Sequence, residues 1–181
     1  MSRIVELAQA YVDAVIKMSD GRTELKEELP PPLKKEEITE KMRSIIPSPL
    51  CALLKWHNGS GGCDLFPDFG LFSAEDIVAS YEGWIKADAL NDESDEIIDE
   101  FVNLVPFLGG EDGMAYYLYN RDNGEVGKLF FEDKVEDIFW EPFESFLEQC
   151  IEYVESGVWR VNRNGVLVDE DVESEEADEE S

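Results

Sequence analysis

The stretch of sequence that decides the fold is VPFLGGEDGMAYYLYNRDNGEVGKLFF, residues 105–131. The Asn123-Gly124 step inside it is typical of a β-hairpin, because these residues accept the backbone angles of a tight turn. Pro106 has no amide donor, which predicts that its strand lies at an edge or carries a bulge. Apolar and aromatic runs around these turns predict three strands, at 102–108, 114–119 and 126–131.

Apolar residues before this stretch recur at steps of three and four, which predicts amphipathic helices. We expect the first helix to end at Gly21, where glycine suits a helix C-terminus. Prolines at 30–32 keep the next segment extended, and a second helix is predicted over roughly 34–46. A third, short helix follows and ends at Asn58-Gly59. The apolar face of the first helix consists of Ile4, Leu7, Ala8, Tyr11, Val12, Val15 and Ile16.

Further elements alternate between helix and strand. A short strand is predicted around 65–72, and Ser73 is the expected N-cap of the helix that follows it. A last long helix runs from Glu141-Pro142 to Gly157, and a small hairpin occupies 158–168. The sequence therefore predicts an α+β fold, with helices packed on a mainly antiparallel sheet of about four to six strands.

The most unusual property of the chain is its acidity. Its 181 residues include 43 acidic and 15 basic side chains, giving a net charge of −28 and a pI near 4.1. Between Lys86 and Arg121 there is no basic residue, and the segment 169–181 also has none. Such charge repels nucleic acids and anionic membranes and attracts cationic partners. Nine carboxylates of the first acidic stretch are the predicted partner-binding residues: Asp88, Asp92, Glu93, Asp95, Glu96, Asp99, Glu100, Glu111 and Asp112.

The nine carboxylates of the tail 169–181 have two interpretations, a solubilising role and a partner role, and both stay open. We expect this tail to be disordered. The three cysteines, Cys51, Cys63 and Cys150, form no disulfide framework and suit a reducing compartment. The N-terminus resembles no secretory signal, and no apolar run approaches the roughly 20 residues that span a bilayer. These features predict a cytoplasmic protein.

Candidate chemistry is sparse. His57 is the only histidine, and the spacing Cys51-x5-His57-x5-Cys63 is unlike that of zinc sites, so we predict no catalytic residue, metal site or cofactor. The glycine-rich loop at 59–62 lacks the lysine of a phosphate loop and is expected only to turn the chain. Aromatic residues on the predicted strands are divided between core and exposed face, with core packing favoured: Tyr116, Tyr117, Tyr119, Phe130, Phe131 and Phe139.

Four motifs in order resemble the SUKH (Smi/Knr-type) superfamily over about residues 29–156. They are the prolyl segment leading through a helix to Trp-His-Asn-Gly, a middle section ending in a tryptophan helix, a Pro-Phe segment before a glycine-rich turn and strand, and a closing Phe-x-x-Phe-Leu helix. The residues that carry the resemblance are Pro31, Leu53, Trp56, Asn58, Gly59, Trp84, Gly113, Phe143 and Phe146.

The resemblance implies a domain over 29–168, preceded by a helix and linker at 1–28 and followed by the acidic tail at 169–181. It also implies a protein without catalytic residues. Members of the superfamily are mostly bacterial immunity proteins that bind toxin domains, often nucleases, and others are regulatory scaffolds. We therefore expect a protein partner, a cationic toxin domain, and neither nucleic acid nor membrane. A regulatory interaction scaffold is the alternative, and a hydrolase or metal enzyme is supported by the His57 and cysteine cluster alone.

Overall fold

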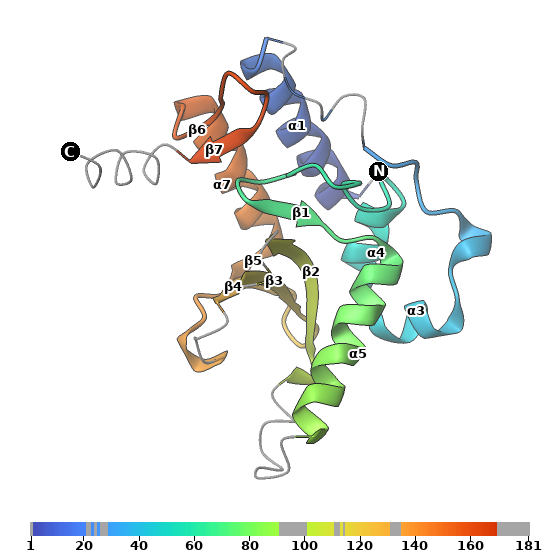
Figure 1. The fold of residues 1–181 in the computed structure, drawn as a ribbon. Coiled ribbons are helices and arrows are strands. Elements are labelled where there is room, and N and C mark those ends of the chain that lie inside the picture. Colours follow the sequence, from blue (N-terminus) through green and yellow to red (C-terminus); the bar gives the residue numbers. More distant parts are fainter. Residues whose placement is uncertain are drawn as a thin grey trace.

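An antiparallel sheet forms the centre of the computed structural model, which describes residues 2–20, 23, 25, 29–90, 101–110, 113, 115–130 and 135–169 (Figure 1). Its strands lie in the order β1-β2-β3-β4-β5, and each neighbouring pair is antiparallel. The predicted α+β class is confirmed. The strands are β1 (Phe69–Leu71), β2 (Leu104–Gly110), β3 (Ala115–Asn120), β4 (Glu125–Phe130) and β5 (Glu141–Pro142).

Helices and a second, two-stranded sheet complete the fold. The helices are α1 (Arg3–Met18), η1 (Lys35–Glu37), α3 (Glu40–Ile45), α4 (Ser48–Leu54), α5 (Ala74–Leu90), η2 (Val135–Asp137) and α7 (Phe143–Ser156). Of these, four helices precede β1, α5 separates β1 from β2, and α7 follows β5 (Figure 1). The small sheet consists of β6 (Trp159–Val161) and β7 (Leu167–Asp169).

The central hairpin forms where the sequence predicts it. β3 pairs with β4 in continuous register, and Gly124 turns the chain with a φ of 79°. β2 lies between β1 and β3, and its register with β3 shifts between Pro106 and Leu108. Of the two alternatives that Pro106 left open, the bulge is confirmed, and β2 is an interior strand. The bulge lets a residue without an amide donor occupy an interior strand.

The larger core lies between the main sheet, α1 and α7. α1 packs along α7, and its Tyr11 ring stacks on Phe66 with the ring centroids 4.9 Å apart. The Tyr11 hydroxyl donates to the carbonyl oxygen of Leu65 at 2.7 Å, so this buried polar group is satisfied. Because Tyr11 and Val15 are almost fully buried, α1 is part of the main core.

A smaller core lies on the other face of the sheet, where β3 side chains alternate between the two faces. Its buried members are Leu104, Leu118, Leu129 and Ile138. The Trp84 ring from α5 meets the Tyr116 ring from β3 edge to face, with the centroids 5.0 Å apart. α5 thus covers this face, and α7 covers the opposite one (Figure 1).

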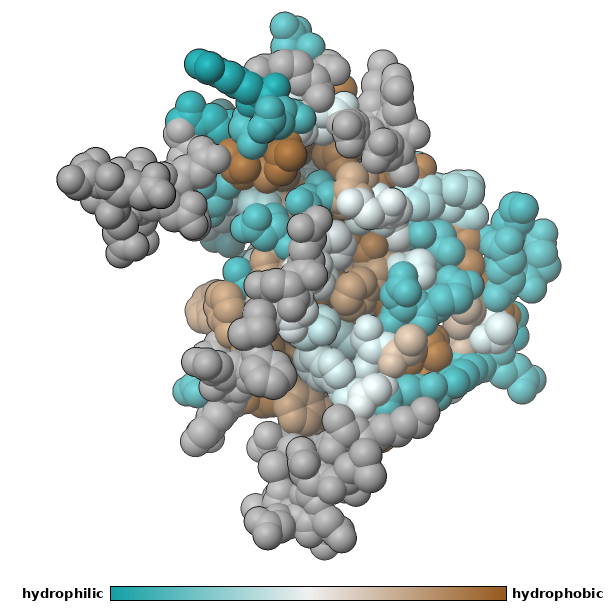
Figure 2. Space-filling model, viewed as in Figure 1, coloured by the Kyte–Doolittle hydropathy of each residue, from teal (hydrophilic) through white to brown (hydrophobic). Residues whose placement is uncertain are grey.

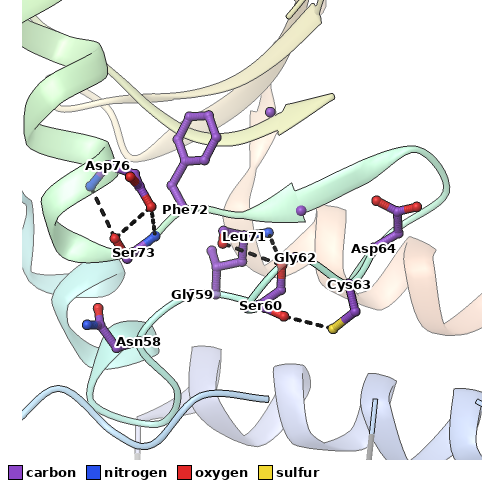
Figure 3. A pocket seen from close by; sticks show the side chains of 13 residues that line it. Asn58, Gly59, Ser60, Gly62, Cys63, Asp64, Leu71, Phe72, Ser73 and Asp76 are labelled. Carbon is purple, nitrogen blue, oxygen red and sulfur yellow. Dashed lines mark hydrogen bonds between the residues drawn. The ribbon is translucent and has the colours of Figure 1, made fainter. Parts of the chain in front are cut away.

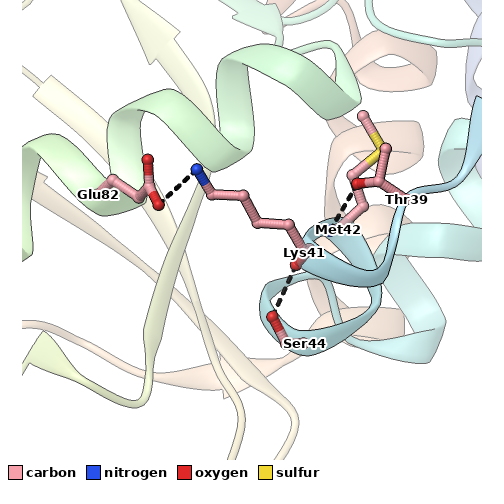
Figure 4. A network of polar contacts seen from close by, with 5 residues as sticks. All are labelled: Thr39, Lys41, Met42, Ser44 and Glu82. Atoms are coloured by element: carbon pink, nitrogen blue, oxygen red, sulfur yellow. Dashed lines mark hydrogen bonds and ion pairs between the residues drawn. The ribbon is translucent and has the colours of Figure 1, made fainter.

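The helix predicted over 34–46 is wrong in extent. η1 covers only Lys35–Glu37, the chain is extended at Ile38 with a ψ of 103°, and α3 begins at Glu40. Thr39 causes the restart, because its Oγ1 accepts a hydrogen bond from the Met42 amide at 3.1 Å (Figure 4). A threonine N-cap satisfies one of the amides that the first turn of a helix leaves without a partner.

Three element boundaries also differ from the prediction. α1 ends at Met18 with Ser19 as its C-cap, whereas Gly21 lies outside the described residues. The strand expected around 65–72 covers only Phe69–Leu71, because a tight turn at Asp68, with a φ of 64°, precedes it. β7 extends to Asp169, the first residue of the predicted tail, and 170–181 lie outside the described residues.

Candidate functional site

The predicted partner-binding carboxylates fall almost wholly outside the part of the chain that the structure describes. Asp88 lies near the end of α5, and nothing further is described of its side chain. The other eight are outside the described residues: Asp92, Glu93, Asp95, Glu96, Asp99, Glu100, Glu111 and Asp112. Their role in binding a partner therefore stays a prediction.

The described residues contain a second acidic surface, which the sequence argument missed. Four glutamates on α7 recur at steps of four, four and three residues, so they share one side of the helix, and all are exposed. The opposite side of α7 carries Phe143, Phe146 and Cys150 into the core. We call this surface the acidic face of α7; it consists of Glu144, Glu148, Glu152 and Glu155.

Within the described residues, one ion pair forms on the acidic face of α7. α7 contains no lysine or arginine, and Arg3 of α1 reaches only one of the four glutamates, with Nη2 2.8 Å from Oε1 of Glu148. Glutamates four residues apart on a helix repel each other and cost a few tenths of a kcal/mol per pair. The helical spacing of these glutamates, on the side opposite the apolar residues, was the feature of the sequence that could have predicted this face.

Charge imbalance extends over the whole molecule. Even if each of the 15 basic residues paired with one carboxylate, 28 of the 43 would have no basic partner. Among the described residues, two ion pairs form: Arg3 with Glu148 at 2.8 Å, and Lys41 with Glu82 at 2.6 Å (Figure 4). Such a surface creates a negative potential that reaches about a Debye length, roughly 8 Å at physiological salt.

The Trp-His-Asn-Gly motif at 56–59 joins three parts of the fold. Asn58 Oδ1 accepts from the Ala74 amide in the first turn of α5 at 2.9 Å, and the Asn58 amide donates to the Pro31 carbonyl at 3.2 Å. Gly59 has a φ of 90°, and a Cβ there would lie 2.9 Å from the Ser73 nitrogen. The asparagine and glycine therefore have structural roles.

His57 and Trp56 also make structural contacts. Nδ1 of His57 lies 2.6 Å from the Pro30 carbonyl oxygen, and the two rings meet edge to face with centroids 4.5 Å apart. Nε1 of Trp56 donates to Oε1 of Gln9 on α1 at 2.9 Å. These contacts fasten the prolyl segment and α1 to the end of α4.

The other residues of the family motifs support the core or turn the chain. Leu53, Phe143 and Phe146 are buried in the larger core. Trp84 packs against the smaller core, and Gly113 has a φ of 69° in the connection between β2 and β3. None of these roles involves a reacting group.

A pocket of about 380 Å³ lies where the glycine-rich loop meets β1 and the start of α5 (Figure 3). Three groups of the protein already occupy the helix start: Asp76 Oδ2 accepts from the Ser73 hydroxyl at 2.7 Å, Ser73 Oγ accepts from the Asp76 amide at 3.2 Å, and Asn58 accepts from Ala74. An anion bound at this helix start would have to accept hydrogen bonds from the same backbone amides. With Asp64 and Asp76 lining it, the pocket does not suit a phosphate.

The cysteines do not gather with His57 into a ligand set. In the described part of the chain, no group of three or more His, Cys, Asp or Glu side chains could hold a metal ion. Cys63 Sγ donates to the Ser60 carbonyl oxygen at 2.8 Å, and Cys150 is buried on α7. Burial holds the pKa of the Cys150 thiol well above its usual value, and the Glu141 charge adds to this effect. A neutral, buried thiol is a poor nucleophile.

The strand aromatics divide between core and surface. Tyr119 is buried, Tyr116 and Tyr117 are half-buried, and Phe131 lies outside the described residues. Phe130 is 49% exposed on β4, where the Lys128 ammonium lies 4.5 Å from its ring centroid. The largest exposure, 82%, belongs to Phe139, which lies in the loop before β5 and not on a strand. On the face shown in Figure 2, hydrophobic residues form small areas among hydrophilic ones.

Comparison with known proteins gives no independent identity. No protein-family model matches the sequence, and a search of curated proteins finds no match. No helix within the described ranges is long and apolar enough to cross a membrane.

Proposed function

We propose that this chain is a non-catalytic binding protein that neutralises a cationic toxin, as an immunity protein of the SUKH type. The excess of carboxylates, with the exposed acidic face of α7 as its best-placed part, is the observation that carries the proposal. The resemblance of the four sequence motifs to the SUKH superfamily supports the same function. Three free thiols among the described residues fit a cytoplasmic location.

A nuclease toxin offers the matching surface. Its substrate-binding cleft carries lysine and arginine to hold phosphates, so an acidic protein can cover the same cleft. Opposite fields speed the encounter and exclude partners of the same sign. The inhibitor needs no reacting group, because occupying the cleft is enough to stop the toxin.

Protection of cells tests this function. The product of the gene adjacent to the one that encodes this chain would be expressed from an inducible promoter, alone and together with the full chain. We expect growth arrest without the chain and growth with it, and a stable complex of the two purified proteins. If the adjacent product is harmless or the chain does not protect, the immunity proposal is wrong.

A pair of variants with equal total charge locates the contact. Glu144→Gln, Glu152→Gln and Glu155→Gln together remove three charges from the acidic face of α7 and keep the Arg3–Glu148 pair. Glu36→Gln, Glu40→Gln and Glu75→Gln remove three charges from exposed positions on other elements. We expect protection to weaken with the first variant only. Equal weakening by both would show that net charge matters and the face of α7 does not.

A further inference from the structure

One region differs in charge from the rest of the molecule. The segment 29–58 contains five basic and three acidic residues, a net charge of +2 in a chain of −28. The five cations are all exposed: Lys34, Lys35, Lys41, Arg43 and Lys55. Lys41 pairs with Glu82, whereas the Arg43 guanidinium makes no hydrogen bond or ion pair to any described residue.

An apolar pocket lies inside this basic region. It has a volume of about 160 Å³ and lies between the prolyl segment, α3 and α4. Leu33, Met42 and Leu54 form buried walls, and Arg43 and Ser48 are the exposed polar residues that line it. Lys34 and Lys55 directly follow two of the wall residues in sequence. The pocket therefore has an apolar interior with one exposed cation, Arg43, in its lining, and it lies in a segment with a net charge of +2.

The walls of this pocket are held in place without a ligand. The Leu33 amide donates to the Leu54 carbonyl at 2.9 Å, which ties the prolyl segment to α4. Thr39 caps α3, and Lys41 ties it to α5 through Glu82 (Figure 4). A site that is already formed loses little conformational entropy on binding.

Size decides what the pocket accepts. Pockets that bind drug-sized ligands and cofactors have volumes of about 300–1,000 Å³, and this pocket is smaller. Its volume equals that of about five water molecules at roughly 30 Å³ each, enough for one apolar side chain. Single side chains that fill such pockets are common anchors of protein interfaces. The Arg43 guanidinium in the lining, with the net positive charge of the segment 29–58, complements carboxylates next to that anchor in a peptide.

We propose that this pocket is a second protein-binding site, which takes one large apolar side chain flanked by acidic residues of a partner peptide. The site is chemically the opposite of the acidic face of α7. It gives the molecule two binding surfaces that select partners of opposite charge. The proposal does not depend on the immunity function, and either one can fail without the other.

Peptide titration followed by methyl NMR tests the site. The probe is the acetylated and amidated peptide Glu-Glu-Leu-Glu-Glu, added to the full chain with labelled methionine and isoleucine methyl groups. We expect saturable shifts at Met42 and Ile46, with a Kd of about 0.1–1 mM, as suits one small anchor. Unchanged methyl signals at Met42 and Ile46 would overturn the proposal.

Matched peptides and variants separate the two parts of recognition. Replacing the leucine of the peptide by alanine tests the apolar anchor, and Arg43→Glu tests the cation in the pocket lining; each should weaken binding at least about tenfold. Arg163→Glu makes the same charge change at an exposed position in the turn between β6 and β7 and should alter the Kd less than about twofold. Because Arg43 is exposed, its variant should unfold at the wild-type temperature.

Two further results would contradict the proposal. Equal binding of the leucine and alanine peptides would show that the pocket is not filled. Tighter binding of octanoate than of the peptide would assign the site to a small anionic amphiphile.

Discussion

Single residues in the motif at 56–59 hold the start of α5 in place. Asn58 supplies an oxygen to the Ala74 amide, a bond whose loss typically costs about 0.5–2 kcal/mol. Gly59 allows the Ser73 backbone to approach closely, because glycine has no Cβ to collide with the Ser73 nitrogen. The same residues that suggest a family by their pattern therefore have a physical reason to be asparagine and glycine.

Two glycines make a matched test at this scale. Gly59→Ala should lower the free energy of unfolding by more than about 1 kcal/mol, because φ is 90° and the new Cβ meets backbone at 2.9 Å. Gly83→Ala, in α5 with nothing within 4 Å, should raise it by about 0.5–1 kcal/mol. Urea denaturation measures both. Equal effects of the two substitutions would contradict the proposed contact between the loop and α5.

At the scale of the element, the sequence predicted whether a segment is a helix or a strand better than it predicted where each element begins and ends. Two runs rich in apolar and aromatic residues, with an Asn-Gly step between them, were enough to predict the β3–β4 hairpin. The helix expected over 34–46 was divided by Thr39, because a local side-chain cap overcame a continuous apolar period. Similarly, Pro106 alone did not decide between an edge strand and a bulged interior strand, because that choice depends on the pairing of β2 with both neighbours.

The candidate site was predictable only in part. The charge count predicted an acidic protein, and the stretches without basic residues predicted where the carboxylates gather. The acidic face of α7 was not predicted, because apolar residues separate its glutamates in the sequence. Folding brings Glu144, Glu148 and Glu152 to one side because the helix repeats every 3.6 residues. The pocket near Arg43 was not predicted, since its walls come from three segments that only the fold brings together.

The acidic face of α7 predicts a stabilising substitution. Glu152→Lys removes repulsion with Glu148 and Glu155, creates an attractive pair four residues after Glu148, and adds a cation near the negative end of the helix. It should raise the free energy of unfolding by about 0.5–1 kcal/mol, with a smaller gain for Glu152→Gln, in thermal or urea denaturation. Loss of stability in both variants would contradict the repulsion described for this face.

At the scale of the whole molecule, self-repulsion should make stability depend on pH and salt. Burial raises the pKa of Glu141 above its ordinary 4.5, so its contribution to stability is fully present below that value and is lost as pH rises through the raised pKa. Repulsion among 43 carboxylates acts in the same direction. We expect the urea midpoint to fall as pH rises from about 4.5 to about 7, where the carboxylates ionise, and about 0.5 M NaCl to restore part of it. A midpoint that rises with pH at low salt would contradict this description.

The whole molecule also has an uneven distribution of charge, with an acidic face on α7 and a net charge of +2 in the segment 29–58 that contributes Arg43 to the pocket. A protein that acts only by binding can use such surfaces independently. The central proposal is that carboxylates drive contact with a cationic toxin, and that this chain acts on the toxin by binding alone.

The most direct test is the association rate constant of the cognate toxin, measured by stopped flow from about 50 to about 500 mM NaCl. Wild-type association should slow at least about tenfold over this range, and the variant with Glu144→Gln, Glu152→Gln and Glu155→Gln should be slower at low salt and less sensitive to salt. The variant with Glu36→Gln, Glu40→Gln and Glu75→Gln should resemble wild type. A rate that does not change with salt, or a toxin that this chain inactivates by covalent modification, would contradict the claim.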